Sequence, residues 1–201
     1  MKGDDRRKML LARAKKLFSK RGYYQTQISD IVKNAKIARG TVYQYFKNKD
    51  DILTSLLQTA YDEWQASIAK EMEGVDLSSL PPREYVKFRI RNSLSYFAKD
   101  PELSNLILRM GQGLPANLVQ VIDRLDREII SQMSAEIGWG VKHHMLRKDL
   151  DVELAANVVH GAIIRVAYHY FVKKKTRNKP EEIDTLVDQI FDIIAPGMFL
   201  P

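Results

Sequence analysis

The sequence has 201 residues, 45% of them hydrophobic and 28% charged, so it is long enough and apolar enough to bury a core. This composition excludes an intrinsically disordered chain and a collagen-like one. Because cysteine is absent, disulfide scaffolds and thiolate metal sites are excluded as well. The charged N-terminus lacks the apolar segment of a signal peptide, and no apolar run reaches the ~18 residues of a membrane span. We therefore expect a cytoplasmic protein with no membrane contact.

Charge is unevenly distributed along the chain. The formal net charge is +7, but the first 50 residues hold 14 Lys and Arg against four Asp, a balance of +10, and the remainder stands at −3. A basic N-terminal segment followed by a mildly acidic remainder is typical of a chain whose first segment binds a polyanion. A basic segment that is merely well solvated is the alternative.

Apolar residues recur at helical spacing throughout, and no run alternates with the period of two that is typical of strands. The first helix is expected to end at Gly22, and two short helices fit between Thr26 and Phe46. Longer helices are expected over 50–73, 83–98, 101–111, 116–138, 151–174 and 180–194, with a Gly-, Ser- and Pro-rich loop over 74–82. The predicted fold is all-α, with about nine helices.

The segment that follows the first helix has the pattern of a helix-turn-helix. Thr26 is placed to cap a helix over 27–34, residues 35–37 make a tight turn, and Val42 pins a second helix over 38–45 inward. The outer side of this second helix carries hydrogen-bonding and aromatic groups, and lysines flank it. Such a helix fits the DNA major groove, where side chains read base edges while lysines bind phosphate.

Residues 35–53, AKIARGTVYQYFKNKDDIL, resemble the signature of the tetracycline-repressor (TetR) family of bacterial transcriptional regulators. The family pattern is Ala-Gly-Val-Ser-x-Gly-Thr-Leu-Tyr-x-Tyr-Phe-x-x-Lys-Glu-x-Leu. The resemblance implies a helix-turn-helix DNA-binding domain over 1–49 and a helical effector-binding and dimerisation domain over 50–201. It also implies a homodimer on double-stranded operator DNA, with a small-molecule effector that alters DNA binding.

The chain departs from the family pattern at two positions of this motif. Lys36 stands where the family usually has glycine in the turn, and Ala38 stands where it usually has an N-capping serine. A left-handed lysine costs about 1–2 kcal/mol relative to glycine, and a missing cap costs about 1 kcal/mol. Both changes should lower the stability of the second helix without disrupting the motif. The Lys36 side chain can add a phosphate contact.

Carried over position by position, the resemblance implies a set of DNA-binding residues. Those at the start of the second helix resemble positions that meet base edges, and the others resemble positions that grip phosphate or bases. The set is Thr26, Lys36, Arg39, Gly40, Thr41, Tyr43, Gln44, Tyr45 and Lys49.

The segment 151–174 is apolar on almost every side, and a helix of this kind must be buried on every face. In a protein of this size, it can face its own core on one side and a partner subunit on the other. The predicted dimer interface uses this helix and the last one: Val159, Ile163, Val166, Tyr170, Leu186, Val187, Ile190 and Ile194. A monomer with a central core helix is the alternative.

The helices after residue 82 hold more apolar and aromatic side chains than a helix layer needs, with a few polar groups among them. This mixture is typical of a small-molecule site, so the predicted effector residues are Phe97, Arg109, Met110, Met133, His160, Ile164 and Tyr168. Arg109 would favour an apolar effector with an anionic end. The alternative is that these residues only fill the core. The helix over 50–73 is the only element expected to reach both domains and transmit binding.

Signals of enzyme chemistry are weak. The run Gly111-x-Gly113-x-x-Ala116 loosely matches a dinucleotide-binding motif, but the residues before it have helical spacing, whereas that motif must follow a strand. The adjacent His143 and His144 would point apart on a helix and make a poor metal pair. We therefore expect no catalytic residue, no metal and no cofactor. The predicted function is a ligand-responsive regulator, most simply a repressor released from a palindromic operator by a small, largely apolar effector. A constitutive DNA-binding protein, or a helical enzyme or ligand carrier with a degenerate DNA-binding head, is the alternative.

Overall fold

The computed structural model describes residues 3–75, 80–109, 114–176 and 178–200, and within these ranges the chain is all-α, as predicted. In chain order the helices are α1 (Gly3–Arg21), α2 (Ile28–Ala35), α3 (Arg39–Tyr43), α4 (Lys49–Glu71), α5 (Pro82–Lys99), α6 (Pro101–Ile107), α7 (Ala116–Lys142), α8 (Val152–Ala167) and α9 (Pro180–Met198), and a π-helix, η1 (Tyr168–Lys174), continues α8. No helix in these ranges is long and apolar enough to cross a bilayer.

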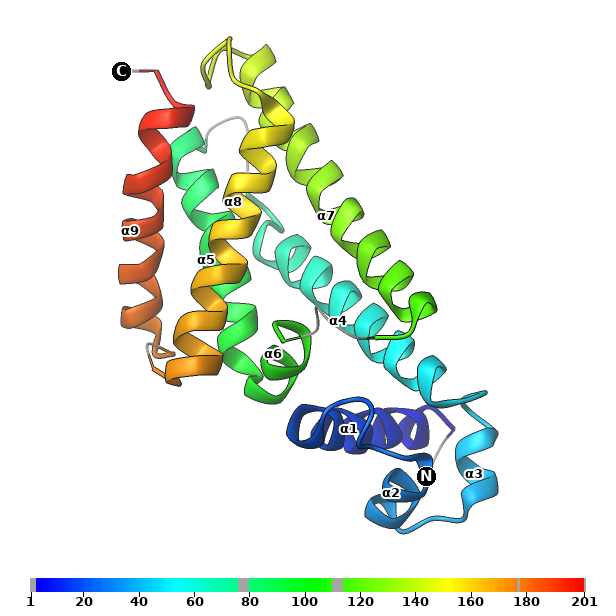
Figure 1. Ribbon diagram of the computed structural model, residues 1–201. Helices are drawn as coiled ribbons and strands as arrows, with labels where there is room; N and C mark the ends of the chain where they lie inside the picture. Colours follow the sequence, from blue (N-terminus) through cyan, green and yellow to red (C-terminus); the bar gives the residue numbers. More distant parts are fainter. Residues whose placement is uncertain (1–2, 76–79, 110–113, 177, 201) are drawn as a thin grey trace.

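Helices α1 to α3 form a small head at one end of the molecule, and α4 leads from it into the body formed by α5 to α9 (Figure 1). The apolar stripe of α1, which includes Leu10 and Phe18, packs with Ile31 of α2 and Val42 of α3. Asn48 begins α4, because its side-chain oxygen accepts a hydrogen bond from the backbone N–H of Asp51 at 2.8 Å. The head is therefore fixed by an apolar core to which α4, α6 and α7 also contribute, with α3 at its outer edge (Figure 1).

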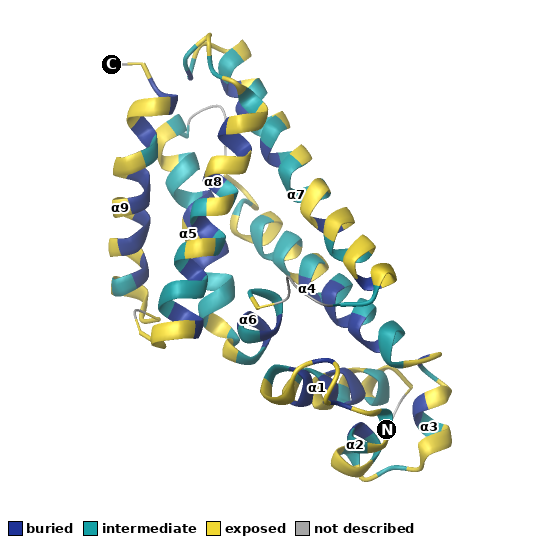
Figure 2. Cartoon of the chain, in the orientation of Figure 1, coloured by how far each residue is buried: buried dark blue, intermediate teal, exposed yellow. Residues whose placement is uncertain are grey.

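In the body, α5 packs against α8 and α9, and α7 packs against α8 and α4. The buried faces of these helices turn toward one another and their exposed faces turn outward, as the colouring of Figure 2 shows. Ile90 and Leu94 of α5 and Val187 of α9 are fully buried in this second core. The body thus has its own hydrophobic core, separate from that of the head.

Helix α7 belongs to both cores. Leu118 and Leu125, in its first half, are buried in the cluster that holds the head together, whereas Met133 and Ile137, in its second half, are buried in the body. The expectation that only the helix over 50–73 reaches both domains was therefore wrong. The physical reason is length, because the 27 residues of α7 span about 40 Å and run beside α4.

Four predicted helices differ from the structure by more than two residues at one end. The helix expected over 116–138 continues to Lys142. The helix expected over 101–111 ends at Ile107, and the one expected over 151–174 changes from α-helix to π-helix at Tyr168. The last helix continues through Pro196 to Met198. The run Gly111-x-Gly113 lies outside the described residues.

Candidate DNA interface and effector cavity

The entrance to the helix-turn-helix is held by a buried threonine. Thr26 is 0% exposed and its hydroxyl donates a hydrogen bond of 2.9 Å to the carbonyl oxygen of Gly22. The N-cap of α2 is instead Gln27, whose backbone N–H donates to the Asp30 carboxylate at 2.9 Å. The predictions that the Thr26 side chain caps this helix and contacts DNA were therefore wrong, because its oxygen is already used inside the head.

The turn between α2 and α3 depends on a left-handed lysine. Lys36 has φ 53° and ψ 46°, and its side chain is exposed. The backbone N–H of Ile37 closes the turn by donating to the Val32 carbonyl at 3.4 Å. The position thus has the backbone conformation that favours glycine, so the strain considered for Lys36 from the sequence is present in the fold.

Helix α3 presents the predicted recognition residues at the outer edge of the head. Arg39, Gly40 and Gln44 are exposed, and Tyr43 keeps 45% of its surface. The Arg39 guanidinium donates to the Tyr43 hydroxyl at 3.3 Å, so these two side chains support each other. Ala38 begins the helix without a side-chain hydrogen bond, in line with the missing cap. Thr41 and Tyr45 are half-buried.

Lys49 folds back onto the head. Its Nζ donates a hydrogen bond of 2.9 Å to the Tyr23 carbonyl and lies 4.1 Å from the centroid of the Tyr23 ring. Burial lowers the pKa of the Lys49 ammonium. A phosphate contact by Lys49 remains a prediction, and it would compete with these contacts.

A hydrogen-bonded chain next to Lys49 joins the head to α7. The Tyr23 hydroxyl donates to the Asp50 carboxylate, which also accepts from the Asn117 side chain at 2.8 Å. The hydrogen bond from Tyr23, followed by that from Asn117, lowers the pKa of Asp50. Burial, followed by the hydrogen bond to Asp50, raises the pKa of Tyr23. No sequence pattern indicates this link, because its three residues lie in separate segments of the chain.

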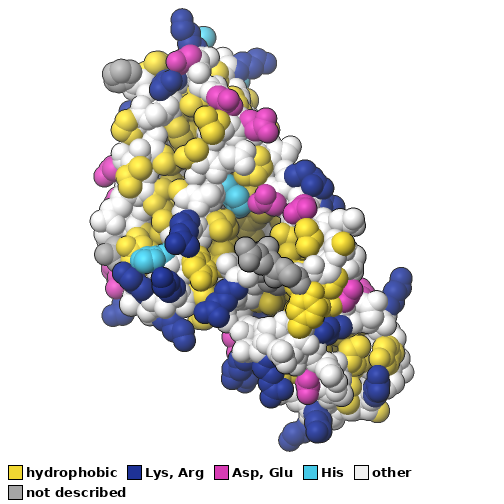
Figure 3. All heavy atoms as spheres, viewed as in Figure 1, with side chains coloured by type: hydrophobic (Ala, Val, Ile, Leu, Met, Phe, Trp, Pro, Cys, Tyr) yellow, Lys and Arg dark blue, Asp and Glu magenta, His cyan; other side chains and the backbone are white. Residues whose placement is uncertain are grey.

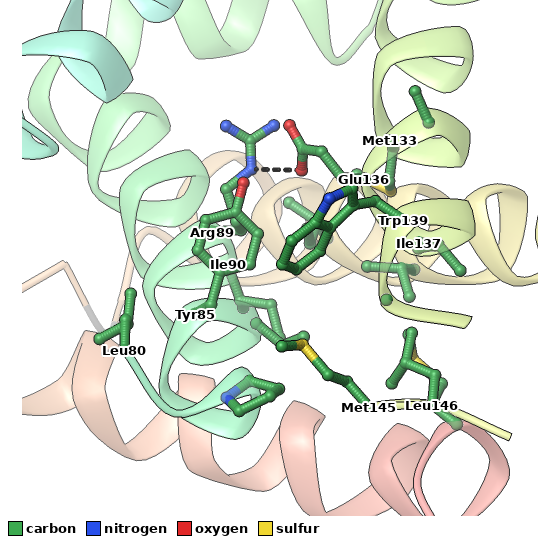
Figure 4. A pocket seen from close by; sticks show the side chains of 17 residues that line it. Leu80, Tyr85, Arg89, Ile90, Met133, Glu136, Ile137, Trp139, Met145 and Leu146 are labelled. Atoms are coloured by element: carbon green, nitrogen blue, oxygen red, sulfur yellow. Dashed lines mark ion pairs between the residues drawn. The ribbon is translucent and has the colours of Figure 1, made fainter. Parts of the chain in front are cut away.

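The body contains a cavity of about 480 Å³ between α5, α7, α8 and the end of α9 (Figure 4). Its walls are apolar except at one end. The lining residues are Leu80, Pro82, Tyr85, Val86, Arg89, Ile90, Met133, Ala135, Glu136, Ile137, Trp139, Gly140, Met145, Leu146, Val159, Ile163 and Met198.

Of the predicted effector residues that the structure describes, only Met133 lines this cavity. Arg109 is exposed just after the end of α6, and Phe97 packs against the body core from outside the cavity. His160 faces α7, with its Nε2 3.0 Å from the Asp126 carboxylate, and burial lowers its pKa. Ile164 and Tyr168 are half-buried elsewhere, and Met110 lies outside the described residues. Helical spacing alone could not select the face of each helix that meets the cavity.

The polar end of the cavity holds an ion pair that sequence reasoning missed. Arg89, only 9% exposed, lies on α5 with its Nε 3.2 Å from a carboxylate oxygen of Glu136 on α7. Figure 4 shows the two side chains directed toward each other, with the Tyr85 ring beside them. Burial raises the pKa of Glu136 against the effect of the Arg89 charge and a hydrogen bond from Tyr85, and burial first of all raises the pKa of Tyr85 to about 12. No local spacing indicates this pair, because Glu136 lies 47 positions after Arg89 in the chain.

Comparison with known proteins decides the family. The model of "Bacterial regulatory proteins, tetR family" matches residues 10–56. The HTH-type transcriptional regulator YhgD of Bacillus subtilis is 31% identical over 195 residues, covering 96% of this chain and 97% of that one. The chain belongs to the TetR family of transcriptional regulators.

Other members of the family are similar to this regulator over most of its length. The fatty acid metabolism regulator protein of Bacillus subtilis is 30% identical over 75% of each chain. The crystal structure of FadR from Bacillus subtilis in complex with stearoyl-CoA shares the fold, with a TM-score of 0.82 at 22% identity over 94% of this chain and 98% of that one. FadR from Bacillus halodurans has a TM-score of 0.84 at 22% identity, covering 98% of each chain.

The surface of this TetR-family regulator carries an apolar patch on its last helices. Leu154 and Val158 of α8 are 60% and 52% exposed, and Ile193 of α9 is 80% exposed. Figure 3 shows hydrophobic side chains gathered over these two helices. We refer to these three residues as the α8/α9 patch.

The predicted interface residues lie on the opposite side of these helices. Val159, Ile163, Leu186, Val187 and Ile190 are all buried within the single chain, and Val166, Tyr170 and Ile194 pack against the same core. The prediction that a partner subunit buries the first five was wrong, because their own chain already does. The apolar character of α8 on every side, from which an interface was expected, is divided between this core and the patch.

Proposed function

We propose that this regulator is a homodimeric repressor that is released from a near-palindromic operator by a small, largely apolar effector. The effector binds in the cavity lined by Met133 and Ile163, and the head binds the operator in the bacterial cytoplasm. The family membership supports DNA binding, and the basic charge of the first 50 residues supports it independently.

The observation that carries the effector proposal is the path of α7. Its second half supplies Met133, Glu136 and Gly140 to the cavity wall, and its first turn supplies Asn117 to the hydrogen-bonded chain at Asp50. An effector that binds one position of α7 better than another shifts the population of the two. Because the head is attached to α7 through Asp50, its position changes when the preferred position of α7 changes.

The chemistry of the cavity and the relatives support a long aliphatic effector. Most lining side chains are apolar, and Met133, Met145 and Met198 are flexible enough to follow an alkyl chain. A relative at 30% identity is named for fatty acid metabolism, and a protein of the same fold was solved with stearoyl-CoA. We therefore assign the effector to acyl compounds or molecules of similar shape.

On the DNA side, we propose that Arg39, Gly40 and Gln44 meet base edges and that Tyr43, Thr41, Tyr45, Lys36 and Lys49 bind phosphate or flanking bases. Exposure of Arg39, Tyr43 and Lys36 at the edge of the head supports this assignment. Two such heads in one dimer would enter successive major grooves about 34–36 Å apart. This spacing requires a two-fold contact away from the heads.

We propose that the α8/α9 patch provides that contact. Leu154, Val158 and Ile193 are large apolar side chains on adjacent helices of the body, and a self-complementary patch is what a two-fold dimer requires. The contact should bury more than about 1,000 Å² in total. Ile193→Glu should produce monomers in sedimentation at micromolar concentration, whereas Val119→Glu, which changes an exposed valine on α7, should leave the dimer intact. A monomeric wild type would refute the dimer.

One experiment tests the proposed function as a whole. The purified full chain selects fragments from random-sequence DNA, and the selected sites are examined for inverted repeats. Fluorescence anisotropy then measures release from the selected site by acyl compounds of increasing chain length. Enrichment of a palindrome with release by one class of compound supports the proposal. A selected site from which no acyl compound releases the protein refutes the assignment of the effector to acyl compounds and favours a constitutive DNA-binding protein.

A further inference from the structure

The cavity contains one pair of opposite charges, and that pair limits what an effector can place beside it. Among the described lining residues, Arg89 and Glu136 are the only charged ones, and they lie together at one end. The apolar residues Leu80, Met145 and Leu146 lie at the other end (Figure 4). An elongated amphipathic molecule therefore has one position for its polar group, next to this pair.

Both charges are held from more than one side. Arg89 pairs with Glu136 at 3.2 Å and its guanidinium carbon lies 5.8 Å from the centroid of the Trp64 ring on α4. Glu136 accepts a hydrogen bond from the Tyr85 hydroxyl in addition to its pairing with Arg89. The pair thus connects α4, α5 and α7, and separating it would leave an uncompensated charge away from water.

This arrangement discriminates between effector head groups by charge. A carboxylate placed at Arg89 also approaches the Glu136 carboxylate and must displace it, and an ammonium placed at Glu136 meets the same obstacle at Arg89. An uncharged oxygen is repelled by neither charge. It can accept a hydrogen bond from Arg89, because a guanidinium has five N–H donors and can donate to a ligand while it keeps its ion pair.

We propose that the Arg89–Glu136 pair selects effectors whose buried polar group is an uncharged oxygen acceptor, such as an ester or thioester carbonyl, and rejects free carboxylates and amines of the same chain. This inference rests on the proposed effector cavity and replaces the anionic end that was expected from Arg109. Any charged part of such an effector stays outside the polar end of the cavity.

Three probes with a common chain test the proposal: methyl decanoate, decanoate and decylamine. Isothermal titration calorimetry with the full-length protein measures their binding. Methyl decanoate should bind at least about tenfold more tightly than either charged probe. Equal or tighter binding of decanoate overturns the proposed selection while leaving the effector cavity in place. Failure of all three probes to bind overturns both the selection and the acyl cavity, whereas operator selection still tests the DNA-binding function separately.

Removal of one charge should reverse the preference. Glu136→Gln leaves Arg89 unpaired, so decanoate should gain at least about tenfold while methyl decanoate changes by less than about threefold. The matched control is Glu128→Gln on the same helix, because Glu128 is 41% exposed and pairs with Arg124 on the surface. This control should leave all three affinities unchanged, and an equal gain in both variants overturns the proposal.

A second substitution keeps the test decisive if Glu136→Gln does not fold. Arg89→Met preserves the length and apolar stem of the side chain but leaves the Glu136 carboxylate without its cation. Decylamine should then become the preferred probe. Thermal unfolding of each variant checks that the fold is retained, and unchanged preferences in a folded Arg89→Met variant overturn the role of the pair.

Discussion

Lys36, the left-handed residue in the turn between α2 and α3, can be tested directly, because its substitution by glycine and by alanine separates the effect of backbone strain from that of charge. Lys36 has φ 53°, a conformation that costs an L-residue about 1–2 kcal/mol and glycine nothing. Glycine also makes the unfolded chain more flexible, which removes about 0.5–1 kcal/mol of that gain. Lys36→Gly should therefore stabilise the protein by about 0.5–1 kcal/mol.

Urea denaturation followed by circular dichroism measures this gain, which corresponds to a rise of about 1–4 °C in Tm for a chain of this size. Lys36→Ala is the matched control, because it removes the same charge but keeps the left-handed strain. Lys33→Gly is a second control, in the last turn of α2, where glycine in a helix should destabilise by about 1 kcal/mol. If Lys36→Gly is no more stable than Lys36→Ala, the strain argument is refuted.

The same variants test whether the lysine touches DNA. If Lys36 neutralises one phosphate in each subunit, both substitutions should flatten the plot of log K against log salt by about 1.8 per dimer. The glycine and alanine variants should lose affinity equally, since the charge and not the backbone makes the contact. Unchanged slopes in both would remove Lys36 from the DNA interface.

The remaining predictions concern single contacts. Ala38→Ser should add a cap to α3 and raise the unfolding free energy by about 0.5–2 kcal/mol in urea titrations. Arg39→Ala should reduce discrimination between operator and random DNA by about 1–3 kcal/mol per half-site in competition assays. Because burial lowers the pKa of His160, stability should fall as pH drops below about 6.5, and His160→Asn should lessen that fall in unfolding at successive pH values. Asn117→Ala should retain operator binding but weaken effector release, as anisotropy would show.

The reading head could be predicted from sequence because its determinants are local. Two short apolar stripes, a three-residue turn and the run around Arg39 fall within about twenty residues, so spacing alone placed both helices. Thr26 was assigned wrongly as cap and contact because a threonine hydroxyl suits either an N-cap or a bond to a carbonyl four residues back. The sequence does not show whether a backbone N–H at the start of α2 or the carbonyl oxygen of Gly22 lies within reach of the Thr26 hydroxyl.

The effector cavity could not be placed for a different reason. Helix α8 is apolar on every side, so periodicity gave no means of telling whether Val159 faces the core, the cavity or a partner. Arg109 and Arg89 have similar apolar neighbours in sequence, but only Arg89 has an acid across the cavity, Glu136, which lies 47 positions further along the chain. Contacts between distant helices decided both cases.

In the proposed mechanism, the position of Glu136 on α7 connects effector choice with DNA release. Glu136 and Asn117 lie on the same helix, one opposite Arg89 in the cavity and the other bonded to Asp50 at the start of α4. Because α7 is packed into both cores, a displacement of its cavity end is carried along the helix rather than absorbed by a loop. In the proposed mechanism, a neutral effector binds beside the intact Arg89–Glu136 pair and favours one position of α7, whereas a charged effector must first separate the pair. In this proposed mechanism, selection of the ligand and movement of the head thus depend on the same helix, α7.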